Sequence, residues 1–218
     1  MEVDSTQEKR QKTHHEARMI PGLGALEYGF PNSITTKLRY HGQYVYNSTL
    51  GAPAPWIFRA NGLFDPDYSN TGHQPLYRDT YAGIYDYYVV LGAKITVRFH
   101  SNSATSGFLC GIVASDTPTI STTVDTLCEQ NNAVHAVIGN ISSPGTTLFM
   151  TYSPLENIGA VGEDDLSMLT AVGSDPSTVQ YFGIWVATSD ATTTAGCVVD
   201  ATVEYTVKFS TLSKPVQN

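Results

Sequence analysis

Hydrophobic and polar residues alternate with a period of two over much of the chain, which is the pattern of half-buried β-strands. The clearest case is the stretch 197 to 212 (CVVDATVEYTVKFSTL), where apolar side chains take nearly every second position. The stretches 37 to 46 (KLRYHGQYVY) and 93 to 100 (AKITVRFH) alternate in the same way. We therefore predict that one face of each strand contacts a core and that the other faces solvent.

Two stretches are apolar throughout, 107 to 115 (GFLCGIVAS) and 179 to 188 (VQYFGIWVAT), which is typical of strands covered on both faces. Residues 76 to 88 repeat tyrosines at steps of three and four, which predicts a helical turn leading into a strand. Residues 121 to 131 predict another helical turn with Ser121 as its cap. Further short strands are predicted at 56 to 62, 133 to 139 and 146 to 152, and a long loop with helical turns at 153 to 177.

These eight strands, with no long helix and no internal repeat, predict an all-β sandwich. Two architectures fit, an eight-stranded antiparallel jelly roll with short helical turns in the loops and an immunoglobulin-like sandwich. Trp56 and Trp185 are not placed for the Cys–Trp–Cys core of the second. The long connections favour the jelly roll, in which the first, eighth, third and sixth strands share one sheet.

The chain is predicted to have two parts. Residues 1 to 31 are polar and then rich in Gly and Pro, which predicts an N-terminal arm, and residues 32 to 218 form the jelly-roll domain. The first 20 residues lack the apolar stretch of a signal peptide, and no run of 18 apolar residues predicts a membrane span.

Composition narrows the function. Charged residues make up only 15% of the chain, against roughly 25% in ordinary soluble domains, which suits a surface largely covered by copies of the same protein. The net charge of −8 does not favour a nucleic-acid binder driven by overall charge. Cys110, Cys128 and Cys197 are odd in number and show no CxxC spacing, so we interpret them as small buried hydrophobes and predict no cofactor.

The stretch 63 to 75 (LFDPDYSNTGHQP) is the strongest candidate for chemistry. Three interpretations fit Asp65, Asp67 and His73: a metal site, an acid–base cluster, or parts of a loop with a structural role. We favour the structural loop. Pro66 would keep Asp65 extended, Asp67 would accept from backbone amides, and Gly72 would supply a positive φ. His73 and Gln74 would satisfy buried backbone groups.

No enzymatic constellation is evident elsewhere, so we predict no catalytic activity. There is no G-x-S-x-G turn, and the histidines after the arm stand singly, unlike the paired histidines of a cupin. The densest acidic run, Glu163, Asp164 and Asp165, is either a solvated loop or a weak calcium site between subunits.

Residues 58 to 99 resemble the most recognisable block of the single jelly-roll capsid proteins of circular, Rep-encoding single-stranded DNA viruses. The family's elements occur here in the same order, namely Asn61, Asp65-Pro66-Asp67, Gly72-His73-Gln74-Pro75, Tyr81 with Tyr85 and Tyr88, and Val90-Leu91-Gly92-Ala93-Lys94-Ile95. The resemblance implies a coat protein that assembles with itself, in a multiple of sixty positions, into an icosahedral shell around a small single-stranded DNA genome. The implied location is the virion, and the host cell, including its nucleus, during assembly.

The arm departs from the family, whose capsid proteins usually begin with an arginine-rich segment. Lys9, Arg10, Lys12 and Arg18 are balanced by Glu2, Asp4, Glu8 and Glu16, so neither genome binding nor nuclear import by the arm is supported. A carbohydrate- or receptor-binding jelly-roll module is the alternative function. The host and the receptor are not evident from the sequence.

In shells of this kind the sheet that holds the first strand tends to line the interior. The outward face of its first, third and eighth strands would carry Lys37, Arg39, Lys94, Arg98 and Lys208, with His41 and His100. This face is a weak phosphate-facing surface that acts by charge, or it is only a solvated sheet face. The aromatic residues of 81 to 88 and 56 to 58 either form contact surface between subunits or belong to the core.

Overall fold

The computed structural model describes residues 30–49, 52–159, 168–190 and 192–214, and the backbone of the short antiparallel pair β1 (Met19–Ile20) and β2 (Gly24–Ala25). Ser33–Asn218 form one compact unit, distinct from Met1–Asn32. Nearly all of the predicted arm lies outside the described residues, so its role stays a prediction. Within the described part, no helix has the length and apolar character needed to cross a bilayer.

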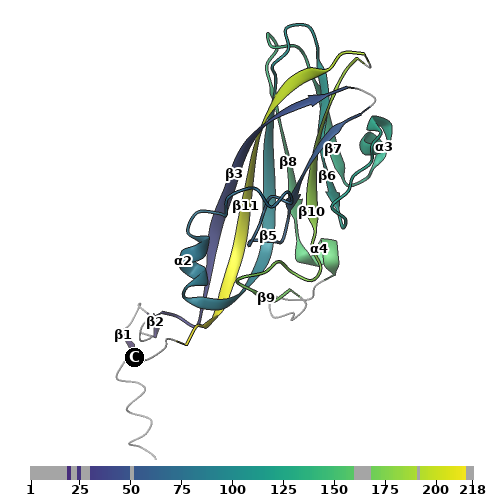
Figure 1. Cartoon of the computed structure of the whole chain (residues 1–218). Coiled ribbons are helices and arrows are strands. Elements are labelled where there is room, and N and C mark those ends of the chain that lie inside the picture. The colour runs from purple at the N-terminus through teal and green to yellow at the C-terminus, as the bar shows by residue number, and fades with distance from the viewer. Residues whose placement is uncertain are drawn as a thin grey trace, which may run out of the picture. The chain divides into compact units, whose positions relative to one another are not determined.

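Two antiparallel sheets build the unit Ser33–Asn218 (Figure 1). The strand order of the first sheet is β3-β11-β5-β8, and the order of the second is β4-β10-β6-β7. The strands of the first sheet are β3 (Ser33–Ser48), β11 (Ala195–Leu212), β5 (Tyr85–Ser101) and β8 (Thr146–Tyr152). Those of the second are β4 (Ala54–Arg59), β10 (Tyr181–Thr188), β6 (Phe108–Ser115) and β7 (Ala133–Ile138).

This strand order is that of a jelly roll. The eight main strands are those predicted from the alternation, and the first, eighth, third and sixth of them share one sheet as expected. Strand β11 lies between β3 and β5, and Val203 pairs with Tyr40 on one side and with Ile95 on the other. The predicted all-β jelly-roll fold is confirmed.

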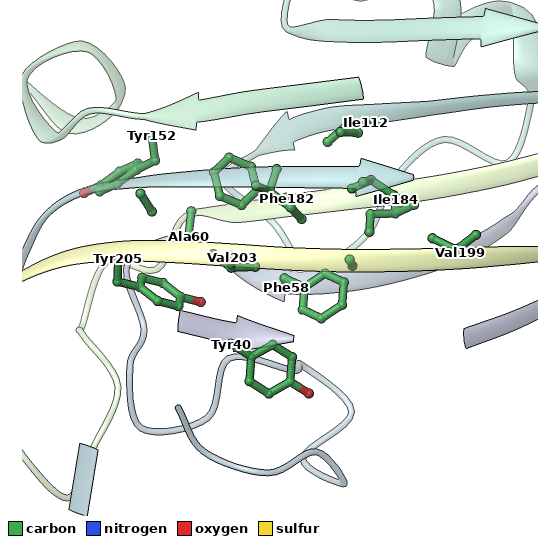
Figure 2. Close-up of a cluster of buried hydrophobic side chains, with 14 of the residues drawn as sticks. Tyr40, Phe58, Ala60, Ile112, Tyr152, Phe182, Ile184, Val199, Val203 and Tyr205 are labelled. Atoms are coloured by element: carbon green, nitrogen blue, oxygen red, sulfur yellow. The ribbon is translucent and has the colours of Figure 1, made fainter. Parts of the chain in front are cut away.

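The main core fills the space between the sheets. Val199, Val203 and Tyr205 of β11 face Phe182 and Ile184 of β10 (Figure 2), and all five are almost completely buried. They are the inward residues that the period of two predicts. The Tyr205 hydroxyl donates to the Arg59 carbonyl oxygen at 2.8 Å, so its polar atom is satisfied inside the core.

The outer face of the second sheet is also covered. Trp185 of β10 and Val113 of β6 pack against Val124 and Leu127 of helix α3 (Val124–Glu129). This explains why β6 and β10 read as apolar throughout, and the predicted burial on both faces is confirmed. The backbone of Gly111 lies directly beside the Trp185 side chain, and a Cβ added there would come within 2.7 Å of the indole ring.

Several boundaries differ from the expectation. Strand β5 begins at Tyr85, just after helix α2 (Arg78–Ala82), and a bulge interrupts its pairing with β11 beside Thr206 and Val207. Thr123, not Ser121, is the N-cap of α3, because the helix begins later than predicted. The predicted loop 153 to 177 holds helix α4 (Pro154–Ile158) and the two-residue strand β9 (Thr170–Ala171), which pairs with β5.

The aromatic stretches proposed as contact surface belong mainly to the core. Phe58, Tyr85 and Tyr88 are at most 1% exposed. The ring of Tyr81 stacks on Phe209, with 4.9 Å between centroids. Cys110 and Cys197 are free and buried, and burial raises the pKa of both thiols to about 12, which fits their interpretation as small hydrophobes. Cys128 of α3 is also free but only partly buried, so the predicted burial does not extend to it.

Candidate nucleic-acid interface

The five cations predicted to face phosphate lie on one surface. Alternation along β3, β5 and β11 directs their side chains to the outer face of the first sheet, away from the core. We call this surface the basic face and define it by Lys37, Arg39, Lys94, Arg98 and Lys208, with the carboxylates Asp200 and Glu204 between them. Five of the eight Lys and Arg residues in the described part of the chain are thus gathered on one sheet face.

The carboxylates order the cations. Glu204 pairs in register with Arg39 and Lys94, and Arg39 Nη2 lies 2.6 Å from Glu204 Oε1. The hydrogen bond from Arg39 lowers the pKa of Glu204, helped by the charges of Arg39, Lys37 and Lys94. Because the side chains are 68% and 44% exposed, the pair contributes only about 0.2–1 kcal/mol. Five cations against two carboxylates leave the face positive on an acidic protein.

An exposed aromatic ring lies on the same face. Phe149 of β8 pairs with Thr96 and is 60% exposed, and Lys94 Nζ lies 4.8 Å from the centroid of its ring. Phe149 was not among the residues predicted for this face. The alternation within residues 146 to 152 was the available signal, since it directs residue 149 to the outer face.

The basic face continues into a hollow beside β3. The hollow has a volume of about 530 Å³, and its lining includes Lys37, Arg39, His41, His73, Leu76 and Tyr77. Leu76 and Tyr77 are 70% and 66% exposed. Cationic, imidazole and apolar groups therefore meet at the β3 edge of the sheet.

The loop 63 to 75 is held together by Asp67. Its Oδ1 accepts from the Ser69 backbone N–H at 2.9 Å, which forms the predicted Asx-type turn. Its Oδ2 accepts from the Tyr44 hydroxyl and the Trp56 indole N–H, each at 3.1 Å. With both oxygens engaged and the residue only 2% exposed, Asp67 has a structural role.

Arg59, which sequence reasoning missed, is the second anchor of the loop. Its guanidinium donates to the carbonyl oxygens of Asp65 and Asp67 and to Asn70 Oδ1. Its Nε lies 3.1 Å from Asp175 Oδ2. Burial raises the pKa of both Asp65 and Asp175, and the Arg59 charge opposes that rise.

Other residues of the block 58 to 99 also form hydrogen bonds within the same chain. Asn61 donates to the Thr178 carbonyl oxygen and accepts from Gln180 N–H, each at 2.8 Å. Gln74 Nε2 donates to the Phe64 carbonyl oxygen. The His73 ring nitrogens lie 2.8 and 2.9 Å from the carbonyl oxygens of Gln74 and His41, as predicted for side chains that satisfy backbone groups. The backbone N–H groups of Arg59 and Arg78 donate to the carbonyl oxygens of Pro66 and Pro75.

The expectation for Gly72 was wrong. Gly159 is the glycine with a positive φ among the described residues, and in this loop Asn70 takes that conformation with φ 57°. Glycine is needed at 72 because the Tyr40 hydroxyl and the Asp67 Cβ occupy the space of a side chain. His73 stacks on the same Tyr40 ring at 4.6 Å, so the loop packs closely onto β3.

Nothing in the described segments supports a metal in the loop. No three His, Cys, Asp or Glu side chains come together there in a way that could hold an ion. Glu163, Asp164 and Asp165 lie outside the described residues, so the calcium hypothesis stays a prediction.

No protein-family model and no curated protein sequence matches the chain. Among solved structures, a chain of tobacco necrosis virus superposes with a TM-score of 0.54 at 15% identity, covering 87% of each chain. The two chains share a fold. The 60-mer BFDV capsid protein gives a TM-score of 0.49 at 12% identity, over 87% of this chain and 100% of that one. A chain of Desmodium yellow mottle tymovirus superposes with a TM-score of 0.45 at 15% identity, covering 91% of this chain and 99% of that one.

Proposed function

We propose that this protein is a viral coat protein that assembles with itself into a closed icosahedral shell around a small single-stranded genome. The observation that carries the proposal is a jelly-roll fold in which residues 58 to 99, the block that resembles the capsid proteins, make contacts within the same chain. Asn61, Asp67 and His73 of that block bind other parts of the same chain. This is the use expected of a building block, in which a loop keeps a defined shape so that copies can fit together.

Assembly follows from geometry. Copies of one rigid sandwich that make the same contacts close into a shell of point-group symmetry, and an icosahedral shell has a multiple of sixty positions. Individual contacts can be weak because each subunit makes several at once. Exposed apolar side chains at different places on the sandwich, such as Ile141 and Leu155, supply contact surface.

The basic face would line the interior and contact the genome. Lysine and arginine side chains neutralise phosphates without reading sequence, so binding would be weak, sensitive to salt and independent of sequence. Resemblance favours single-stranded DNA as the genome. We expect the protein in the virion and, during assembly, in the host cell, including its nucleus.

Expression of the full chain, followed by size-exclusion chromatography and negative-stain microscopy, tests the proposal. We expect closed particles of megadalton mass. A chain that remains a monomer or trimer over a range of pH, salt and protein concentration would contradict it and would favour a carbohydrate- or receptor-binding module.

A further inference from the structure

Phe149 is placed as an aromatic platform within the basic face. Its partner Thr96 lies midway along β5 between Lys94 and Arg98, so the ring has a cation on either side along the neighbouring strand. Lys94 already contacts the ring, and 60% of Phe149 remains exposed. An exposed ring flanked by cations can stack on a base while the cations neutralise the adjoining phosphates.

Tyr77 supplies a second ring at the opposite edge of the sheet. It lines the hollow beside β3 with Lys37 and Arg39, and it is 66% exposed. Its backbone lies in the left-handed region with φ 68°, a conformation that is unfavourable for tyrosine and is common at functional sites. The strain is tolerated although the ring buries little surface in the chain itself.

We propose that the basic face binds single-stranded nucleic acid by stacking unpaired bases on Phe149 and Tyr77, and that it therefore prefers single strands to duplexes. Three strand spacings of about 4.8 Å separate β3 from β8, so the two platforms lie at opposite edges of a face about 14 Å wide. Bases in a duplex are stacked on one another, and their faces are not available to either ring. The inference rests on the proposed function, because it specifies how the coat would hold its genome.

Charge favours nucleic acid over a second copy of the chain as the occupant. The chain as a whole carries a net charge of −8, whereas the basic face holds five cations and two carboxylates. A polyanion complements this distribution directly. A copy of the chain that docked on Phe149 would have to desolvate Lys94 and Arg98 along with the ring.

The test measures the affinity of the full chain for three fluorescein-labelled probes, at a protein concentration where light scattering detects no particles. The probes are an oligo(dT), an oligonucleotide of equal length made of abasic sites, and a duplex of that length. We expect Phe149→Ala to lower the affinity for oligo(dT) by about five- to tenfold and to leave the abasic affinity unchanged. Phe149→Trp should restore binding, and Val137→Ala, which removes an exposed apolar side chain of the other sheet, should have no effect.

Tyr77→Gly separates binding from folding. Glycine adopts a positive φ without strain, so the variant should melt about 2 °C higher than the wild type. It should nevertheless bind oligo(dT) more weakly than the wild type. Lower affinity with higher stability cannot result from misfolding.

Three results would overturn the inference. One is equal wild-type affinity for oligo(dT) and the abasic probe, and another is an equal loss on both probes in Phe149→Ala. The third is loss of particles in Phe149→Ala, seen by microscopy, which would make Phe149 a contact between subunits and would leave the coat-protein function standing. Failure of the wild-type chain to form particles counts against the proposed function alone, because probe binding is measured on unassembled chains.

Discussion

Asp67 accepts hydrogen bonds from three donors that come from three places in the sequence, Ser69, Tyr44 and Trp56. The carboxylate therefore connects the loop to β3 and to β4. Buried polar groups of this kind stabilise a fold because every donor has a partner, and removing one acceptor leaves a buried donor unsatisfied. At the scale of the residue, the loop owes its shape to these internal contacts.

We predict that Asp67→Asn lowers the free energy of unfolding by about 1–3 kcal/mol. The amide offers one oxygen in place of two, so the Trp56 or the Ser69 N–H loses its acceptor. Urea unfolding monitored by tryptophan fluorescence measures the change. Asp125→Asn, an exposed change in the first turn of α3, serves as the control and should alter stability by less than about 0.5 kcal/mol. Equal stabilities of the two variants would contradict the structural role of Asp67.

Helix α3 is the element that turns one side of the sandwich into a second core. It covers Trp185 and Val113 on the outer face of the second sheet, whereas on the outer face of the first sheet four cations are exposed and Lys208 is partly exposed. The closeness of this packing depends on Gly111, whose missing side chain leaves room for the Trp185 ring. The two outer faces therefore differ: helix α3 covers the apolar one, whereas the other is charged and is covered at Val89, where Met168 and Ile158 pack.

Gly111→Ala is expected to destabilise the fold by about 1–3 kcal/mol, because the added methyl group overlaps the Trp185 ring. Thermal unfolding followed by circular dichroism measures the effect. Gly173→Ala is the matched control, since nothing lies within 4 Å of the added Cβ there. An unchanged melting temperature for Gly111→Ala would show that Trp185 can move away at no cost, contrary to the close packing described.

The whole molecule separates its charges. The described chain holds eight Lys and Arg residues, and apart from the five on the basic face these are the buried Arg59 and Arg78 and the exposed Lys214. Asp200 and Glu204 lie on the basic face and Asp67 is buried, whereas other described carboxylates are exposed outside that face, namely Asp116, Asp125, Glu129, Glu156 and Asp190. An acidic protein with one cationic face can orient a polyanion on that face while its other surfaces repel it.

Charge reversal tests this arrangement. The double variant Arg39→Glu/Arg98→Glu should give particles with much less nucleic acid, read as a lower ratio of absorbance at about 260 to 280 nm, because four units of charge change on one face. Lys214→Glu changes an exposed cation away from the face and should leave the ratio near that of the wild type. Unchanged nucleic-acid content in the double variant would show that the genome is held elsewhere.

Much of the fold and part of the candidate site could be predicted from the sequence. Alternation along β3, β5 and β11 placed Lys37, Arg39, Lys94, Arg98 and Lys208 on one side of their strands, because side-chain direction in a strand depends only on position. Asp67 was predicted to form a turn, since its contact with Ser69 is local. Arg59 was missed because its partners Asp175 and Asn70 reach it only after the chain has folded.

The strands, the direction of their faces and the local turn chemistry are encoded in the order of residues alone, since they follow from a period of two and from contacts between near neighbours. Which element covers each apolar face, and why particular residues are required beneath it, became evident only from the folded chain. Gly72 is small because of Tyr40, and Gly111 because of Trp185, and in each case the partner lies far away in the sequence. The physical reason is that packing is a property of surfaces brought together by the sheet topology, and no short stretch of sequence contains both of them.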